Sequence, residues 1–350
     1  MSGRFLLYGA NGYTGELVAR TAAARGHKPI LAGRNRAAVE PLARELGLEL
    51  RSFPLDDPKA IDEGLAGIDV VLHCAGPFSR TARPMAEACL RTRTHYLDIT
   101  GEIPVFESLA ARHAEAKAAG VMLLPGAGFD VVPSDCLAAH LKRRLPSAAH
   151  LALAFFSGAG WSRGTATTMI ENLDRGGVVR RDGKLVPVPA AWRTREIDFG
   201  RGPRPCVTIP WGDVSTAYHS TGIPNIEVYM AAPWPMRAGM VLSRPFSKLL
   251  GSAPVQRFLK TRVNKGAPGP SADVRARARA VLWGEAADAQ GGRACARLRT
   301  PEGYTLTALT SLAIVERVLQ GDAPAGFKTP SSAYGPDFIL DIEGVTREDL

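Results

Sequence analysis

The first fifteen residues constrain the fold of this chain more than any other stretch does. A short apolar run ends at Tyr8, and glycines then recur at every third position, at Gly9, Gly12 and Gly15. A helical pattern begins directly after them. Glycines permit a tight turn, and a helix N-terminus presents unpaired N–H groups to an anion. A strand, a glycine turn and a helix in this order indicate a dinucleotide pyrophosphate site; a ligand-free structural turn is the alternative.

The end of the second apolar run, residues 28–32, bears on which dinucleotide would bind. An acidic residue at this point binds the ribose 2′-hydroxyl of NAD, whereas an arginine accommodates the 2′-phosphate of NADP. No Asp or Glu occurs between Glu16 and Glu40. Arg34 and Asn35 follow the run instead. The sequence therefore favours NADP over NAD, although an arginine exposed in a turn is the alternative.

The order of apolar and helical patterns predicts the architecture of the first part of the chain. Six short apolar runs alternate with helical segments; the runs are residues 4–8, 28–32, 48–53, 68–73, 94–98 and 121–125. Strands that are separated by helices and joined by short loops predict a doubly wound parallel sheet of the Rossmann type. We expect residues 105–119, between the last two strands, to form one helix.

Hairpin signals replace this alternation after residue 150. A two-residue turn signal lies within residues 178–188, and residues 274–283 and 293–299 alternate between arginine and small residues. Residues 189–223 are expected to be irregular, because they are rich in Pro, Gly and Trp. The predicted fold class is therefore α/β, a Rossmann doubly wound parallel sheet with a second α+β domain that carries a mixed or antiparallel sheet.

The predicted domain boundaries follow the same change of pattern. We expect residues 1–130 to form the NAD(P)-binding Rossmann domain. Residues 131–322 would form an α+β domain for substrate binding or dimerisation, which makes a homodimer an expectation. Residues 323–350 are predicted to be a C-terminal tail that returns toward the Rossmann domain.

Small and polar side chains follow the fourth, fifth and sixth predicted strands, at the edge where open α/β sheets bind ligands. Residues 74–77 are small enough for a cofactor to lie against the backbone. Tyr96, Asp98 and Asp130 are the candidate catalytic residues, and Asp130 is favoured because it lies at the predicted domain junction. Asp98 and Glu102 form either a paired acid and base or a helix cap and its partner.

Five motifs occur in one order along residues 3–145. They are Gly9-Ala-Asn-Gly-Tyr-Thr-Gly15, Ala32-Gly-Arg34, Cys74-Ala-Gly-Pro-Phe78, Tyr96-Leu-Asp98-Ile-Thr-Gly101-Glu102 and Gly128-Phe-Asp130-Val-Val-Pro-Ser-Asp135. Together they resemble the saccharopine dehydrogenase-like NAD(P)-binding oxidoreductases, and among these the saccharopine reductase-like and trans-acting enoyl reductase-like branch. The resemblance implies pyridine-nucleotide chemistry and a second domain that closes over the nicotinamide.

The resemblance also implies where a cofactor, expected to be NADP, would bind. The candidate contacts are the motif residues and their direct neighbours: Gly9, Asn11, Gly12, Tyr13, Thr14, Gly15, Arg34, Asn35, Cys74, Ala75, Gly76 and Pro77. We expect an oxidoreductase that reduces an enoyl, imino or carbonyl group of a small or carrier- or lipid-linked substrate. No tyrosine is followed by a lysine four residues later, which excludes the Y-x-x-x-K mechanism of short-chain dehydrogenases.

A hydrolase is a distant alternative. Residues 160–164 match the G-x-S-x-G pattern of a nucleophile elbow. No strand directly precedes this pattern, and His219 is the only later histidine that could act as the base. The favoured interpretation is a helix N-terminus at which Ser162 and Thr165 donate hydrogen bonds to the substrate.

Residues 231–265 mix apolar and basic side chains, and no acid occurs until Asp273. Such a segment can lie on an anionic membrane or hold an acidic carrier protein. A helical insertion packed on the second domain, with a solvated basic face, is the alternative. The segment also carries the runner-up function, which is a non-catalytic NADP-binding protein that associates with a membrane.

Composition narrows the partners and the compartment. Five scattered cysteines without a C-x-x-C pair argue against a zinc site or a disulfide framework, so no metal is expected. The arginine rows lack the interleaved aromatic residues of a nucleic-acid platform, so no nucleic acid is expected. No apolar run reaches about eighteen residues, and the N-terminus reads as a strand rather than a signal peptide. The expected location is the cytoplasm, with peripheral membrane contact as an option.

Overall fold

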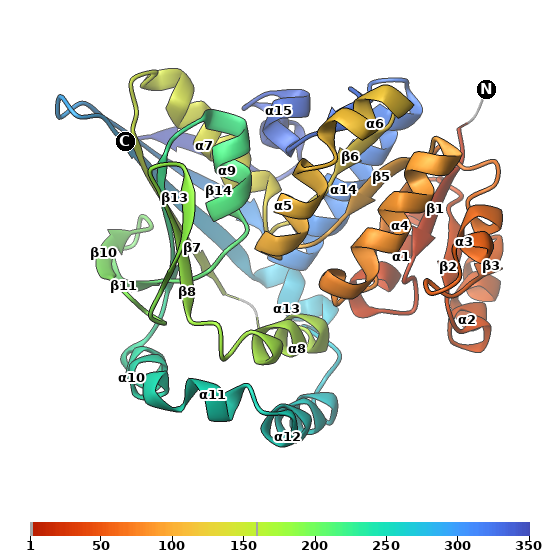
Figure 1. Ribbon diagram of the computed structural model, residues 1–350, viewed down its shortest axis with the longest axis horizontal. Helices are drawn as coiled ribbons and strands as arrows, with labels where there is room; N and C mark the ends of the chain where they lie inside the picture. Colours follow the sequence, from red (N-terminus) through yellow and green to blue (C-terminus); the bar gives the residue numbers. More distant parts are fainter. Residues whose placement is uncertain (1–2, 159) are drawn as a thin grey trace. The chain divides into compact units, whose positions relative to one another are not determined.

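The computed structural model of the chain describes residues 3–158 and 160–350 (Figure 1). The described residues divide into two compact units. Unit 1 comprises the chain up to Val132 together with Tyr304–Gly335. Unit 2 comprises Pro133–Gly303 together with Pro336–Leu350. Each unit contains its own sheet.

Unit 1 is built on a sheet whose described strands follow the order β15-β6-β5-β4-β1-β2-β3 (Figure 1). The strands are β1 (Phe5–Tyr8), β2 (Ile30–Gly33), β3 (Leu50–Ser52), β4 (Val70–His73), β5 (His95–Asp98), β6 (Met122–Leu124) and β15 (Gly326–Phe327). All of these neighbours pair in parallel. The six strands expected from the sequence are present, and the predicted doubly wound parallel sheet is confirmed.

Helices enclose this sheet. They are α1 (Tyr13–Ala24), α2 (Arg36–Leu46), α3 (Pro58–Gly64), α4 (Phe78–Thr92), α5 (Ile103–Ala110), α6 (His113–Ala119), α14 (Gly303–Leu319) and α15 (Pro330–Tyr334). Helix α4 packs against α3, α5 and α6 as one layer, while α1 packs against α2. The central strands β1 and β4 are consequently buried at every position, as expected for a parallel sheet.

The prediction of a single helix over residues 105–119 is wrong. The structure contains α5 and α6, separated by a turn at Ala111 and Arg112. The N–H of Arg112 donates to the carbonyl of Leu109, three residues back, which tightens the chain and ends the regular helix. The Arg112 guanidinium also bonds Glu87 of α4 at 2.6 Å. The apolar periodicity passes through this turn because both helices face the same sheet.

Unit 1 also includes residues 304–335, the first part of which was predicted to lie in the second domain. Helix α14 belongs to unit 1 rather than to the second domain. The hydroxyl of Thr310 donates to the carbonyl of Ala127 at 2.8 Å, and strand β15 then pairs with β6. Only the residues up to Gly335 follow this course, because strand β16 (Thr346–Asp349) pairs with a strand of unit 2.

Unit 2 is built on a mixed sheet whose described strands follow the order β10-β11-β12-β7-β13-β14-β16. These strands are β7 (His150–Ser157), β10 (Thr194–Asp198), β11 (Pro203–Thr208), β12 (Asn225–Ala231), β13 (Arg279–Ala287), β14 (Arg293–Pro301) and β16. Strands β7 and β12 pair in parallel, and the other neighbours pair antiparallel. The hairpin of β8 (Gly177–Arg181) and β9 (Lys184–Val188) joins at β12. The predicted second, mixed sheet is confirmed.

Two local predictions for unit 2 are wrong. Residues 189–223 are not irregular, because they contain β10, β11 and helix α9 (Asp213–Thr221). Prolines stand in β11 beside Asp198 and Glu196 of β10, and the connecting turn uses positive φ at Gly200 and Gly202. The Pro and Gly content that suggested an irregular segment thus belongs to a hairpin and its turn.

The alternating stretch at residues 274–283 is helical in its first part. Helix α13 (Ala272–Arg277) begins at Ser271, whose hydroxyl accepts from the N–H of Val274 at 3.4 Å. Strand β13 starts only at Arg279. Alternation of arginine and alanine is compatible with either conformation, and the serine cap decides the first turn. The expected hairpin with β14 is present.

The remaining helices of unit 2 precede or follow its strands. They are α7 (Val132–Arg144), α8 (Arg163–Glu171), α10 (Trp234–Leu242), η1 (Arg244–Phe246), α11 (Ser247–Leu250) and α12 (Ala253–Asn264). The segment at residues 231–265 is therefore a series of short helices that follows β12 (Figure 1). Within the described chain, none of the helices has both the length and the apolar character that crossing a membrane requires.

Candidate cofactor and active site

The glycine turn after β1 is held by the backbone of the neighbouring strands. The N–H groups of Gly9 and Ala10 donate to the carbonyl of Ala32, at 2.8 and 3.2 Å. Gly9 has a φ of +86°, and a Cβ placed there would lie 2.7 Å from the nitrogen of Ala75. A Cβ on Gly15 would collide with the carbonyl oxygen of Gly9. Both glycines are therefore required by packing inside unit 1.

Gly12 differs from the other two glycines. Its φ is −81°, which any residue can adopt, and the nearest described atom to a Cβ at this position is the carbonyl oxygen of Gly9, at 3.3 Å. Gly12 is exposed, and it stands at the N-cap of α1, where a helix N-terminus attracts anions. A Cβ here would be only slightly too close to that backbone oxygen, so packing constrains Gly12 less than it constrains Gly9 and Gly15.

The other candidate residues of this turn surround the start of α1. Asn11 is exposed, and its side-chain oxygen lies near Gly33 at the end of β2. Thr14 is half-buried in the first turn of the helix. The ring of Tyr13 meets the ring of Tyr304 edge-on, with 5.1 Å between their centroids. Tyr304 comes from the start of α14, a contact that the sequence did not suggest.

Arg34 follows β2 directly and is exposed. Among the described residues it makes no ion pair, so its guanidinium is available to an anion. Burial raises the pKa of Tyr8 to about 12, the nearby charge of Arg34 opposes this rise, and Asp56 adds to it. The charges of Arg34 and Asp56 therefore act on the Tyr8 hydroxyl in opposite directions. Asn35 is exposed at the N-cap of α2.

The loop after β4 lies against the glycine turn. The N–H of Cys74 donates to the carbonyl of Tyr8 at 2.7 Å, and Ala75 is the closest neighbour of Gly9. The carbonyl of Ala75 accepts from the Thr81 hydroxyl at 2.7 Å. Burial raises the pKa of the Cys74 thiol far above its ordinary value, so the thiol stays neutral. Gly76 is exposed, and Pro77 is half-buried at the N-cap of α4.

Asp98 joins the loops that follow β5 and β6. Its carboxylate accepts hydrogen bonds from the Tyr96 hydroxyl at 2.7 Å and from the N–H groups of Thr100 and Gly126, each at 2.9 Å. Burial nevertheless raises the pKa of Asp98 to about 6, and it also raises the pKa of Tyr96 well above the usual value. Both side chains are fully buried. This geometry suits positioning of the two loops better than contact with a substrate.

The Glu102 carboxylate hydrogen-bonds to the backbone at the start of α4. Its two carboxylate oxygens accept from the N–H groups of Phe78 and Ser79, at 2.7 and 3.0 Å. These are the first N–H groups of α4, so Glu102 satisfies the N-terminus of that helix. Of the two alternatives left open by the sequence, the geometry favours the helix cap.

Asp130 lies in the loop after β6, and its carboxylate packs over Gly101 in the loop after β5. A Cβ on Gly101 would lie 2.7 Å from Oδ2 of Asp130. Asp130 is half-buried, and burial raises its pKa to about 7. Among Tyr96, Asp98 and Asp130, only Asp130 is both partly accessible to solvent and able to change its protonation state near neutral pH.

Comparison with known proteins assigns the domain that carries this turn. Residues 5–124 match the family model of the saccharopine dehydrogenase NADP binding domain. These residues of unit 1 are therefore similar to a saccharopine dehydrogenase NADP binding domain. The resemblance seen in the sequence is confirmed over this range, and so is NADP as the nucleotide of the domain family.

Curated relatives of the NADP-binding domain are named trans-acting enoyl reductases. The protein from Mycobacterium leprae is 34% identical over 148 residues, which are 40% of this chain and 35% of the relative. The protein from Mycobacterium ulcerans is 29% identical over 216 residues, which are 57% of this chain and 52% of the relative. The chain thus spans about a third to a half of the length of these relatives.

A solved structure matches nearly the whole chain. Apo saccharopine dehydrogenase (L-Glu forming) from Saccharomyces cerevisiae aligns over 99% of this chain and 100% of its own, with a TM-score of 0.65 and 14% sequence identity. At this identity the match concerns the fold. It agrees with a parallel sheet followed by a second, mixed sheet in one chain.

The predicted substrate residues Ser162 and Thr165 lie in unit 2, outside the NADP-binding domain. Ser162 is the buried N-cap of α8, and its Oγ accepts from the N–H of Thr165 at 3.2 Å. The two hydroxyl oxygens are also 3.2 Å apart. Helix capping therefore accounts for the G-x-S-x-G pattern locally. Ala159, just before the pattern, lies outside the described residues.

Unit 1 contains two further residues that sequence reasoning missed, Thr307 and His73. The N–H of Phe129 donates to the hydroxyl of Thr307 in α14 at 3.0 Å, which braces the loop that carries Asp130. His73, at the end of β4, is fully buried between Tyr8 and Phe78, and neither ring nitrogen has a partner among the described residues. Burial lowers the pKa of His73 to about 3, so it is neutral. No local pattern identifies either residue.

Proposed function

We propose that this protein is an NADP-dependent oxidoreductase, which reduces an enoyl, imino or carbonyl group of a small or carrier- or lipid-linked substrate. The observation that carries the proposal is the open turn at Gly12, together with the available cation of Arg34 at the end of β2. The match of residues 5–124 to an NADP binding domain and the names of the curated relatives support the same conclusion.

The cofactor contacts are proposed from these two features. The N–H groups at the start of α1 would hold the pyrophosphate, because Gly12 is exposed and the helix N-terminus is electropositive. Arg34 would pair with the 2′-phosphate. The backbone of residues 75–77 would lie along the nucleotide, because the Thr81 hydroxyl fixes this loop beside Gly9. NADPH, when bound, supplies a hydride.

The chain's own contribution to the chemistry would be a proton at Asp130. A general acid is most useful when its pKa lies near the working pH, and burial places the pKa of Asp130 at about 7. Its Oδ2 lies over Gly101, at the edge of the sheet where open α/β folds bind ligands. Tyr96 and Asp98 would act indirectly by holding the loops after β5 and β6.

The contribution of Asp130 to the rate of turnover should depend on the kind of group that is reduced. Reduction of a carbonyl or imine requires a proton on the heteroatom, which a positioned acid supplies. Reduction of an enoyl group requires a proton on carbon, which water can supply. Asp130→Asn should therefore slow turnover of a ketone or imine by about 10²-fold or more, and turnover of an enoyl thioester by less.

A second candidate function is a non-catalytic NADP-binding protein that associates with a membrane. The observation in its favour is the set of large apolar side chains that α10 to α12 expose. The two candidates differ in turnover rather than in nucleotide binding. Binding of NADPH without its oxidation in the presence of any substrate class would favour the second candidate.

The first experiment measures nucleotide binding and turnover with the full chain. NADPH should quench the protein fluorescence and raise the melting temperature more than NADH does. Loss of NADPH absorbance is then followed with an enoyl thioester, a cyclic imine and a ketone. The absence of a thermal shift with both nucleotides would refute the proposed cofactor, and therefore the proposed activity.

A further inference from the structure

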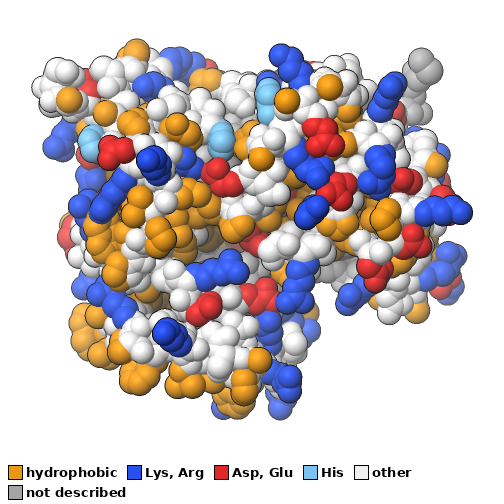
Figure 2. Space-filling view, in the orientation of Figure 1, with side chains coloured by type: hydrophobic (Ala, Val, Ile, Leu, Met, Phe, Trp, Pro, Cys, Tyr) orange, Lys and Arg blue, Asp and Glu red, His pale blue; other side chains and the backbone are white. Residues whose placement is uncertain are grey.

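Residues 233–265 expose several large apolar side chains. The exposed fractions are 70% for Trp234, 71% for Leu242, 58% for Phe246, 59% for Leu249 and 60% for Phe258. None of the described residues in α10, η1, α11 or α12 is buried. Figure 2 shows hydrophobic side chains gathered along the lower rim of the view, over these helices. A helix packed on a globular unit usually places its large apolar side chains inward, so this number of exposed ones in one short segment is unusual.

The same stretch is basic throughout. It contains no Asp or Glu, and its seven cations are Arg237, Arg244, Lys248, Arg257, Lys260, Arg262 and Lys265. On α12 the exposed positions Phe258, Arg262 and Lys265 follow helical spacing, so cations and an aromatic ring share one face. The guanidinium of Arg262 lies 5.6 Å from the centre of the Phe258 ring. Apolar and positively charged groups thus point together toward solvent.

Polar contacts hold these helices on unit 2. Lys260 of α12 pairs with Glu171 of α8 at 2.7 Å. Arg244 donates to the carbonyls of Ala190 and Ala191, each at 2.9 Å, and Arg163 donates to the carbonyl of Gly266. These contacts fix the helices without using the large apolar side chains, which remain available for a partner.

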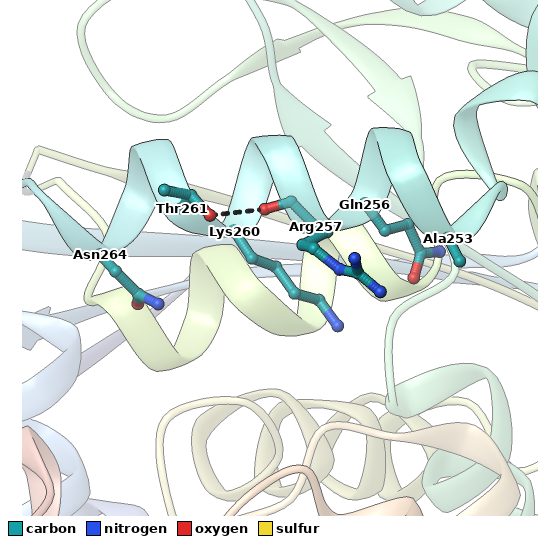
Figure 3. A pocket seen from close by; sticks show the side chains of 6 residues that line it. All are labelled: Ala253, Gln256, Arg257, Lys260, Thr261 and Asn264. Atoms are coloured by element: carbon teal, nitrogen blue, oxygen red, sulfur yellow. Dashed lines mark hydrogen bonds between the residues drawn. The ribbon is translucent and has the colours of Figure 1, made fainter.

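The polar side of α12 is visible in Figure 3. A hollow of 410 Å³ runs along it, lined by Ala253, Gln256, Arg257, Lys260, Thr261 and Asn264. The lining contains no large apolar side chain, and Phe258 is not part of it. Arg257 and Lys260 of this lining are two of the seven cations of the segment.

We propose that residues 233–265 form a docking surface for an anionic lipid membrane. Exposed Trp, Leu and Phe side chains would enter the interfacial region, while the surrounding cations would meet anionic headgroups. Tryptophan is among the side chains that membrane interfaces favour, and Trp234 is one of the most exposed apolar residues of the segment. The proposal does not depend on the proposed oxidoreductase activity.

Charge decides against a second copy of this chain as the occupant. A two-fold contact through this surface would place its cations against the same cations. Lys260 already pairs with Glu171 of α8, and the segment contains no acid to pair the other six. An acidic carrier protein would satisfy the charges. A membrane satisfies both the charges and the large apolar side chains spread over several short helices.

The test measures cosedimentation of the full chain with vesicles. We expect binding to vesicles of phosphatidylglycerol and phosphatidylcholine, weaker binding to phosphatidylcholine alone, and a loss of binding at high salt. Arg257→Glu with Arg262→Glu should reduce partitioning at least about tenfold. Leu242→Ser with Phe246→Ser should reduce it to a similar degree, because the apolar anchors are lost.

Matched controls change exposed residues of unit 2 outside this surface. Lys184→Glu with Arg201→Glu reverses two charges, and Val274→Ser with Leu340→Ser removes two apolar side chains. Both controls should partition like the parent chain, and circular dichroism and thermal melting should show that all variants fold.

Three results would overturn the proposal. The first is no difference between anionic and neutral vesicles. The second is equal loss of binding in the controls. The third is absent vesicle binding together with either a dimer that Leu242→Ser with Phe246→Ser dissociates, or a complex with an acidic acyl carrier protein that Arg257→Glu with Arg262→Glu abolishes.

Discussion

Oδ1 of Asp98 accepts a hydrogen bond of 2.9 Å from the N–H of Gly126, and this contact joins the loops that follow β5 and β6. The carboxylate is fully buried and also accepts from the Tyr96 hydroxyl. Asp98 therefore acts as a junction in the edge of the sheet where the candidate active site lies. Its partners explain why a buried carboxyl group is tolerated there.

Replacing Asp98 should weaken the fold before it affects the cofactor. In Asp98→Ala, the Tyr96 hydroxyl and two N–H groups lose their acceptor while buried, which should lower the free energy of unfolding by about 3 kcal/mol or more. Tyr96→Phe removes only one donor and should cost about 0.5–1.5 kcal/mol. Urea unfolding measures both. If Asp98→Ala unfolds at the parent's urea concentration, the junction is energetically unimportant.

Gly12 and Gly15 should respond differently to the same substitution. Gly15→Ala places a Cβ against the Gly9 carbonyl, so it should lower the melting temperature markedly. Gly12→Ala places a Cβ 3.3 Å from the same oxygen, a milder contact, so it should lower the melting temperature less than Gly15→Ala does and weaken NADPH binding by about tenfold or more, by obstructing the phosphate. Thermal melting with and without NADPH measures both effects. Unchanged NADPH affinity in Gly12→Ala would argue against a phosphate at this turn.

Arg34 should control the choice between NADPH and NADH. Arg34→Asp removes the cation at the end of β2 and introduces a repulsive charge, so NADPH should bind at least about tenfold more weakly while NADH changes little. Titration calorimetry with each nucleotide measures the difference. Arg44→Asp is the matched control, because the Arg44 side chain is 80% exposed and lies further along α2. Equal weakening of both nucleotides would remove the 2′-phosphate assignment.

The pH dependence of stability should report on Asp130. Burial raises the pKa of Asp98 to about 6 and that of Asp130 to about 7, so the native protein binds more protons than the unfolded chain between about pH 4 and pH 7. The contribution of both groups to stability therefore falls as the pH rises through this window. In Asp130→Asn, the free energy of unfolding should therefore decrease less between about pH 4 and pH 7 than in the parent chain. Urea midpoints measured across this window test the difference.

Asp337 supplies the opposite control for this experiment. Hydrogen bonds from Arg143 and Arg347 hold the pKa of Asp337 well below its usual range. Its contribution is present at neutral pH and is lost as the pH falls below about 4. Asp337→Asn should therefore flatten the acid side of the profile and leave the slope between about pH 4 and pH 7 in place. If the free energy of unfolding of Asp130→Asn depends on pH as steeply as that of the parent chain between about pH 4 and pH 7, the raised pKa of Asp130 is contradicted.

Local sequence patterns predicted the elements of unit 1 well. The six runs became β1 to β6. The interior strands β1, β2 and β4 are largely apolar and are buried at every position because helices cover both faces of the sheet, whereas β3 at the end of the sheet is not buried. Predictions from local sequence patterns were wrong where one pattern is compatible with two conformations. The apolar periodicity of residues 105–119 continues across the break between α5 and α6, and the alternation at residues 274–283 begins in α13.

The candidate site shows the same division. The glycines at positions 9, 12 and 15 predict a turn from their spacing alone. Only the structure separates Gly12, which is exposed and less constrained by packing, from two glycines that packing requires. Likewise, the acidic residues at the strand ends were visible as candidates. Only their surroundings show that Asp98 is a buried junction and that Glu102 caps α4.

The sequence by itself determined the parallel sheet, the dinucleotide turn and the preference for NADP, because each depends on neighbouring residues that share one short element. Tertiary structure alone decided the role of each side chain around that turn. Thr307 reaches the loop of Asp130 from 178 residues away along the chain, and burial moves the pKa of Asp130 to about 7. Such effects depend on which distant segments fold together, and no local pattern encodes that.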